Sequence, residues 1–232
     1  MRHLELSARL NLLADWVRPG ARIADVGTDH AYLPVWLSLH DRVTSAIASD
    51  LREGPLDRAR QTAARCGTAE RISFRLCGGL DGIARSEADL IAIAGMGGDT
   101  IAQILAAAPW TRDKTLLLQP MTALPALRRW LGQNGYCIRA ERIAREGQRL
   151  YSIWTVEGGE MPALSAGELW AGRQSTDPLR EEYLDFIARK VSRALTGHMA
   201  AAEPDGAVIM ELQAVLTDLL RMKGELERGD LA

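Results

Sequence analysis

The fold is decided within residues 22–34, which read Arg22-Ile-Ala-Asp-Val-Gly-Thr-Asp-His-Ala-Tyr-Leu-Pro34. Five residues of strand character run directly into Gly27, and a helical pattern follows from Ala31, with Pro34 placed where a first helical turn tolerates proline. A short strand that passes through a glycine turn into a helix is the opening βα unit of a parallel sheet. Such sheets bind ligands beyond the carboxyl ends of their strands, so this stretch also indicates where a ligand site should lie.

The same alternation of strand and helix continues along the chain. Further strands are expected at 43–49, 71–76, 88–94 and 115–118, and helices at 31–39, 54–66, 99–108 and 122–132. Two last strands, 136–143 and 150–156, lie close enough in sequence to form a hairpin. Strands separated by helices imply right-handed parallel βαβ units, and the hairpin adds an antiparallel edge. We therefore predict an α/β fold with a doubly wound, Rossmann-like sheet in residues 1–158.

A second unit is expected over residues 159–232, where strand patterns stop and two helical patterns remain. The apolar positions of the first are Leu184, Ile187, Val191 and Ala194, and those of the second are Val208, Leu212, Val215, Leu219, Met222 and Leu226. The second set steps by four and three, as in a coiled-coil seam of about three heptads. We predict a helical hairpin or short coiled coil, which closes either within one chain or between two, giving a monomer or a homodimer.

Composition limits the classes of protein that fit. Of 232 residues, 47% are hydrophobic and 25% charged, which is ordinary for a globular protein. The net charge of -2 argues weakly against nucleic acid as a partner, although a local basic face remains possible. No apolar stretch approaches the roughly 20 residues of a membrane span, and no signal peptide is evident, so we expect no membrane association and a cytoplasmic location. Three scattered cysteines and four unpaired histidines predict no metal site.

Two acidic residues at strand ends are candidates for holding a ligand. Asp25 precedes the glycine of the first turn, and Asp50 directly follows the second strand. The phosphate-binding pattern G-x-G-x-x-G is absent, so a dinucleotide is disfavoured, whereas an acid at Asp25 suits an amine-bearing ligand. The two oxygens of Asp50 can accept both hydroxyl protons of a ribose. The alternatives are a helix-capping role for Asp25 and a turn-forming role for Asp50.

Glycines and an amide follow the fourth and fifth strands. The run Ile93-Ala-Gly-Met-Gly-Gly98 removes side chains from the floor of the expected cleft, unless it only forms a tight turn. Gln119-Pro120 ends the neighbouring strand, and the amide of Gln119 both donates and accepts, so it is suited to reading a base edge. His30, which lies beside the first turn without a metal-ligand partner, is more typical of a hydrogen-bonding role.

These motifs together resemble the TrmK family, bacterial tRNA (adenine-22-N1)-methyltransferases. The resemblance covers the whole chain, and its motifs are Leu6-Ser-Ala-Arg-Leu10, Asp25-Val-Gly-Thr-Asp-His-Ala-Tyr-Leu-Pro34, Ala46-Ile-Ala-Ser-Asp50, Glu53-Gly-Pro55, Ile93-Ala-Gly-Met-Gly-Gly98 and Leu118-Gln-Pro120. It implies the class I methyltransferase form of the sheet, S-adenosylmethionine as cofactor, tRNA as partner, and transfer of a methyl group to N1 of an adenine.

The resemblance also implies roles for particular residues. The cofactor would be held by Asp25, Val26, Gly27, His30, Asp50, Leu51, Gly78, Gly79, Gly95 and Met96. The target adenine would meet Asp29 and Gln119 as catalytic residues, and Arg9, Tyr32, Gly97, Pro120 and Arg128 as substrate-binding residues. Asp29 is our choice for stabilising the positive charge that the methylated ring gains. No metal is implied.

The chain departs from the family pattern at two positions. The family usually has Gly-Asp-Gly-Leu where this chain has Cys77-Gly-Gly-Leu80, so an acid that would contact the cofactor adenine is replaced by Gly78. The family often has Gln-Pro-Asn where this chain has Met121 after Pro120. Two other functions therefore stay open: a small-molecule methyltransferase with the helices as a lid, or a non-catalytic cofactor-binding module that docks a protein partner.

Phosphate contacts would need basic residues, and many are spread along the chain. Candidates on the sheet unit are Arg2, Arg9, Arg128, Arg129, Arg139, Arg142, Arg145 and Arg149, and candidates on the helices are Arg180, Arg189, Lys190, Arg193, Arg221 and Lys223. Acids are equally numerous, so each of these side chains is as readily part of a solvated mixed surface.

Overall fold

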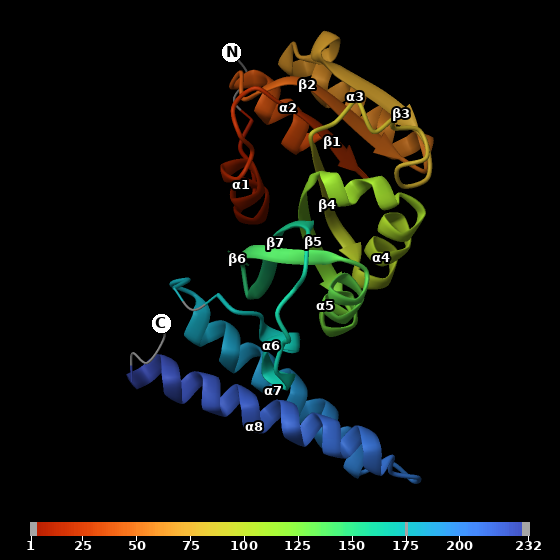
Figure 1. Ribbon diagram of the computed structural model, residues 1–232. Coiled ribbons are helices and arrows are strands. Elements are labelled where there is room, and N and C mark those ends of the chain that lie inside the picture. The colour runs from red at the N-terminus through yellow and green to blue at the C-terminus, as the bar shows by residue number, and fades with distance from the viewer. Residues whose placement is uncertain (1–3, 175, 229–232) are drawn as a thin grey trace.

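Seven strands form one mixed sheet in the computed structural model, which describes residues 4–174 and 176–228 (Figure 1). The strands are β1 Ala21–Val26, β2 Val43–Asp50, β3 Ile72–Leu76, β4 Leu90–Gly97, β5 Thr115–Thr122, β6 Tyr136–Glu146 and β7 Arg149–Gly158. Their order is β3-β2-β1-β4-β5-β7-β6, with β1 to β5 parallel and β7 antiparallel to both of its neighbours. The predicted doubly wound sheet with a terminal hairpin is confirmed.

Helices cover both faces of the sheet. They are α1 Ala8–Asp15, α2 Tyr32–Leu39, α3 Glu53–Cys66, α4 Gly98–Ala107 and α5 Leu124–Gln133, with 3-10 turns η1 Ala69–Arg71 and η2 Pro109–Asp113. On one face, α1, α2 and α3 pack against side chains that include Ile23, and on the other α4 and α5 pack against side chains that include Val26. The strand order reverses between β1 and β4, so the carboxyl ends of these two strands border the crevice where ligands of such folds bind.

Most elements lie within two or three residues of the bounds predicted from the sequence. The prediction that β4 ends before Gly95 is wrong. β4 continues through Gly97, because Gly95 has a φ of +78° and a local shift of register keeps Met96 paired with Pro120 and Gly97 with Thr122. The glycines therefore form a bulged strand end and not a free turn. The two short helices α1 and α6 were not predicted.

Three helices follow the sheet: α6 Ala166–Ala171, α7 Arg180–Met199 and α8 Gly206–Arg228. The apolar faces of α7 and α8 share one cluster, which also includes Ile143 of β6 and Leu150 of β7. The seam predicted from the sequence thus closes within the chain and rests on the hairpin (Figure 1). Because this cluster joins both parts, a domain boundary at residue 158 stays a prediction.

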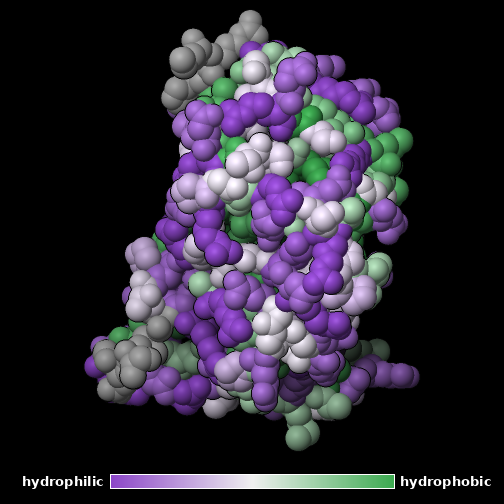
Figure 2. All heavy atoms as spheres, turned by 45° about the horizontal axis from the view of Figure 1, so that its top comes forward, coloured by the Kyte–Doolittle hydropathy of each residue, from purple (hydrophilic) through white to green (hydrophobic). Residues whose placement is uncertain are grey.

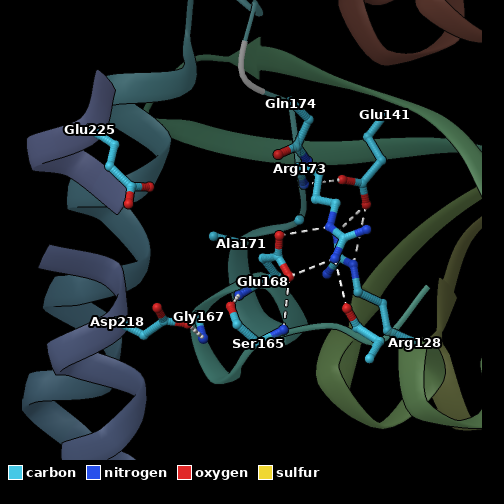
Figure 3. A network of polar contacts seen from close by, with 12 residues as sticks. Arg128, Glu141, Ser165, Gly167, Glu168, Ala171, Arg173, Gln174, Asp218 and Glu225 are labelled. Atoms are coloured by element: carbon cyan, nitrogen blue, oxygen red, sulfur yellow. Dashed lines mark hydrogen bonds and ion pairs between the residues drawn. The ribbon is translucent and has the colours of Figure 1, made fainter. Parts of the chain in front are cut away.

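A buried ion pair fastens the helices to the sheet (Figure 3). The Arg128 side chain is 1% exposed and lies 2.5 Å from Glu141, while its other amino group donates to the Leu169 carbonyl at 3.1 Å. The second Glu141 oxygen accepts from the Arg173 amide at 2.6 Å. The guanidinium also stacks on Trp154, 4.2 Å from the ring centre. The expectation that Arg128 binds substrate is therefore wrong, because its guanidinium is buried and paired with Glu141.

The surface is mostly hydrophilic. In the space-filling view of Figure 2, hydrophilic residues cover most of the face shown, with hydrophobic residues in smaller patches between them. Many exposed arginines are paired with acids, as in Arg22 with Asp89 at 2.5 Å and Arg75 with Glu87 at 2.6 Å. Within the described residues, no helix has the length and apolar character needed to cross a bilayer.

The buried pair leads to a stability prediction that compares two adjacent arginines. Arg128→Ala should lower the free energy of unfolding by about 3–5 kcal/mol, because it leaves the Glu141 charge buried without a partner. Arg129→Ala, which removes an exposed partner of Glu211, should cost about 0–1 kcal/mol. Urea unfolding of both variants checks this. Equal losses in the two variants would show that the buried pair does not fasten the structure.

Candidate active site

The turn after β1 brings the backbone close to a neighbouring side chain. Gly27 has a φ of +75°, and its amide donates to the Ser49 carbonyl of β2 at 2.8 Å. A Cβ at this position would overlap Cε of Met96, which reaches across from the end of β4. Both the left-handed backbone and this close approach require glycine here. Met96 and Gly27 thus meet at the crevice, as the sequence predicted from their positions after β1 and β4.

Asp25 is a buried acid at the end of β1. It is 8% exposed, and burial raises its pKa to about 6, while a hydrogen bond with Thr28 acts in the opposite direction. No side chain caps the helix α2, and the Thr28 hydroxyl accepts the amide of Ala31 at 3.0 Å in the turn that precedes it. The alternative role of Asp25 as a helix cap is therefore wrong. A buried carboxylate with no cation beside it is suited to receiving a positively charged ligand group.

The end of β2 carries the second acid, Asp50. Its carboxylate accepts the amide of Arg52 at 2.8 Å, which fixes its orientation at the strand end. The next residue, Leu51, is 73% exposed, an unusual position for a leucine side chain. Asp50 and Leu51 together place two acceptor oxygens beside an apolar surface.

Gly78 adjoins this surface, and an acid lies next to it. A Cβ on Gly78 would lie 3.7 Å from Leu51 Cδ1 and 3.5 Å from Asp81 Oδ2. The Asp81 amide also donates to the Gly78 carbonyl at 3.0 Å, which closes a tight turn. Asp81 therefore brings a carboxylate close to the position where the family usually has an aspartate. The sequence analysis missed Asp81 because it lies three residues further along.

Gln119 links the ends of β4 and β5 to the N-terminal helix. Its side-chain oxygen accepts from Arg9 at 2.9 Å and from the Gly95 amide at 3.1 Å, and its amino group donates to the Pro120 carbonyl and to Met121 Sδ. The side chain is fully buried. We correct the expectation that Gln119 reads a base, since all of its polar groups are engaged; it positions Arg9. Pro120 is also buried, and it lines the cavity described below.

Arg9 is held from several sides at the edge of the site. Its backbone amide donates to Glu146 at 3.1 Å, its side chain lies 3.3 Å from the same carboxylate, and its guanidinium stacks 5.6 Å from the centre of the Tyr151 ring. One amino group would lie 3.4 Å from a Cβ on Gly95, so it borders the glycine strand end. The partners Glu146 and Tyr151 were not predicted, because they come from the hairpin far along the chain.

Asp29 lies on the exposed side of the first turn. It pairs with Arg58 of α3, and this guanidinium lowers the pKa of the Asp29 carboxyl, which is therefore ionised at neutral pH. Its other oxygen lies 3.5 Å from His30, whose ring stacks on Tyr32 with centres 5.0 Å apart. Three residues expected at the site thus form one group. Arg58 was missed, since nothing in the sequence marks it among the other arginines of its helix.

The structure gathers most expected residues at the carboxyl ends of β1, β2, β4 and β5. Gly97 is there also, and a Cβ on it would lie 3.1 Å from the Thr122 hydroxyl. Among the described residues, no group of three or more potential ligands is arranged to hold a metal ion.

Comparison with known proteins gives the family. A methyltransferase-domain family matches residues 6–154. The tRNA (adenine(22)-N(1))-methyltransferase of Bacillus subtilis is 38% identical over 177 residues, which cover 73% of this chain and 74% of that protein.

Solved structures are similar over more than nine-tenths of this chain. The Streptococcus pneumoniae protein Sp1610, in complex with S-adenosyl-L-methionine, has a TM-score of 0.80 and 34% identity, covering 93% of this chain and 100% of its own. The B. subtilis m1A22 tRNA methyltransferase TrmK has a TM-score of 0.78 and 30% identity, covering 97% and 99%. The sheet, the glycine strand ends and these likenesses together show that the chain is an S-adenosylmethionine-dependent methyltransferase of the TrmK family.

Proposed function

We propose that the protein methylates N1 of an adenine in tRNA, with S-adenosylmethionine as the methyl donor. The observation that carries this proposal is the 38% identity to a tRNA (adenine(22)-N(1))-methyltransferase, combined with a crevice that has the acids and glycines its cofactor needs. By the same likeness, the position modified would be adenine 22.

The crevice residues fit the chemical groups of the cofactor. Asp25 offers a buried negative charge to the ammonium group, and Asp50 offers two acceptors to the ribose hydroxyls. Leu51 supplies an apolar surface for the adenine ring, and Asp81 supplies an acceptor for its amino group. When bound, the cofactor supplies an electrophilic methyl group on a sulfonium.

The protein's part in the reaction is mainly positioning. Adenine N1 has a free lone pair when the base is unpaired, so no proton has to leave before the methyl group is transferred. N1 is blocked in a duplex, and the base therefore has to be extruded or locally opened. The ring gains positive charge on methylation, and the ionised Asp29 beside the first turn would stabilise it.

The remaining proposals concern the setting of the enzyme. The seam of α7 and α8 is closed within the chain, which supports a monomer. A tRNA substrate supports a cytoplasmic location. The sheet unit over 1–158 would carry the chemistry, and the helices over 159–232 would contact RNA.

The first prediction concerns the reaction product. Incubation of the protein with labelled S-adenosylmethionine and unmodified tRNA should give 1-methyladenosine at position 22, measured by nucleoside mass spectrometry and primer extension. A transcript with guanine at position 22 serves as the control and should accept no label. Label in another nucleoside, or equal label in both transcripts, would contradict the proposal.

The second prediction concerns Asp25 and pH. Above its folded-state pKa of about 6, Asp25 is a buried charge that destabilises the empty protein, so Asp25→Asn should raise the melting temperature at pH 7.5. The gain should shrink towards pH 5, where the folded carboxyl takes up a proton while the unfolded one, with a pKa near 4, stays ionised. Cofactor affinity should fall more than tenfold.

Thermal unfolding without cofactor at both pH values, with calorimetry of cofactor binding, checks this prediction. Asp15→Asn is the control, since Asp15 is exposed and pairs with Arg142. It should show neither the gain in stability nor the loss of binding. A lower melting temperature for Asp25→Asn at pH 7.5 would refute the role of burial.

The third prediction concerns Asp81. Asp81→Asn should weaken binding of S-adenosylhomocysteine about tenfold, because a carboxylate acceptor for the adenine amino group becomes a neutral amide. The control is Asp41→Asn, at the amino ends of β2 and β3, which should leave affinity unchanged. Unchanged affinity in Asp81→Asn would show that Asp81 does not replace the acid missing at Gly78.

A further inference from the structure

A second cavity adjoins the active site on the side of the helices. It has a volume of about 520 Å³ and lies between the end of β5, the strand β7 and the helices α6 and α7. This volume is within the range of small-molecule sites, roughly 300–1,000 Å³. No residue of the turns after β1, β2 and β4 lines it, so it is distinct from the cofactor crevice.

Aromatic rings from three elements line the cavity. Tyr151 comes from β7, Trp170 from α6 and Phe186 from α7, and each is partly exposed. Flat aromatic walls suit a flat heterocycle, because any nucleobase can stack on them whatever its sequence identity. The apolar surroundings of the rings also exclude water from such a contact.

Two cations, Arg149 and Lys190, complete the lining. Both are exposed, and neither side chain forms a hydrogen bond or ion pair with another residue of the described part of the chain. On α7, the Arg189 and Arg193 side chains also form no hydrogen bond or ion pair with the described residues. They follow Phe186 at helical spacings of three and seven, so four cations without an acidic partner lie at this cavity and along the adjoining turns of α7.

The other candidates for phosphate contacts are largely neutralised. Arg2 lies outside the described residues. Arg128 and Arg180 are buried, and the remaining side chains each pair with an acid: Arg9, Arg129, Arg139, Arg142, Arg145, Arg221 and Lys223. The structure therefore reduces a scattered set of candidates to one region.

The cavity lies next to the glycine-rich end of β4. Its wall includes Pro120 and Met121, and Pro120 pairs in the sheet with Met96 of the glycine strand end. Tyr151 also stacks on Arg9, which is bound to Gln119 beside Gly95. When the target base lies at the glycine-rich end of β4, the adjacent nucleotide of the RNA therefore lies beside this cavity.

We propose that the cavity holds an unstacked nucleotide next to the target adenine, with its base against Trp170 and Phe186 and its phosphate against Arg149 and Lys190. The inference rests on the proposed RNA substrate. The target base itself does not fit this place, because the cavity shares no lining with the cofactor turns. Four unpaired cations favour a polyanion over an apolar peptide or a neutral small molecule.

The test is a cycle that combines protein variants with altered RNA. Methylation is measured on intact tRNA and on tRNAs that lack the base on the 5′ or the 3′ side of the target adenine. For the wild type, removal of one of these two bases should lower kcat/KM about tenfold, and the change should appear as a higher KM. For the Trp170→Leu variant, kcat/KM on intact tRNA should already be about tenfold lower than for the wild type. Removal of the same base should then change it less than twofold further.

A second pair of variants keeps the test independent of folding. Lys190→Ala should raise KM for tRNA three- to tenfold and make it less dependent on salt, because one phosphate contact is lost. Lys114→Ala, another lysine at the opposite end of β5, should change neither. Cofactor affinity and melting temperature should match the wild type in both.

The outcomes separate the inference from the proposed function. No transfer to intact tRNA by the wild type would overturn both. Normal transfer with no penalty from either missing base, or with equal penalties in the wild type and Trp170→Leu, would overturn the inference alone. A decrease in kcat without a change in KM would place the target adenine in the cavity and would also overturn the inference. Identical behaviour of Lys190→Ala and Lys114→Ala would overturn it as well.

Discussion

The pairing of Arg128 with Glu141 in the protein interior is the interaction on which the rest of the arrangement depends. A charge that is removed from water has to be matched by partners at fixed distances, so this pair fixes α5 against β6. The same two side chains bind the backbone at Leu169 and Arg173, which sets the start of the helical part. The position of α7 beside the end of β5 follows from these contacts, and with it the cavity between them.

Two features of the site lower the stability of the folded protein when no ligand is bound. Asp25 carries a charge that its surroundings do not compensate, and Gly27 gives up backbone rigidity so that Met96 can lie across it. Both features become favourable only when a ligand with a cationic group occupies the crevice. Folding free energy that offsets this local strain comes from the two apolar layers on either side of the sheet.

Local patterns were enough to predict the strands, the helices other than α1 and α6, and the turns that bear Asp25 and Asp50, because each βα unit is encoded by its own short stretch. Interactions between distant stretches were not predictable. Arg128 reads as a surface cation on an amphipathic helix, yet Glu141 and Trp154 bury it. Gln119 ends a strand like a substrate-reading residue, yet Arg9, 110 positions away, occupies its oxygen. The sequence pattern did not show which cations lack an acidic partner.

The extensive pairing of surface arginines with acids has a consequence for how the enzyme behaves in different ionic media. A protein that grips RNA with many free cations owes its affinity to the release of many condensed counterions, and it loses that affinity steeply as salt rises. Here most of the positive charge is already neutralised within the protein, and few cations remain to displace ions from the RNA. We therefore expect the affinity of this protein for RNA to fall less steeply with salt than that of a protein with many free cations.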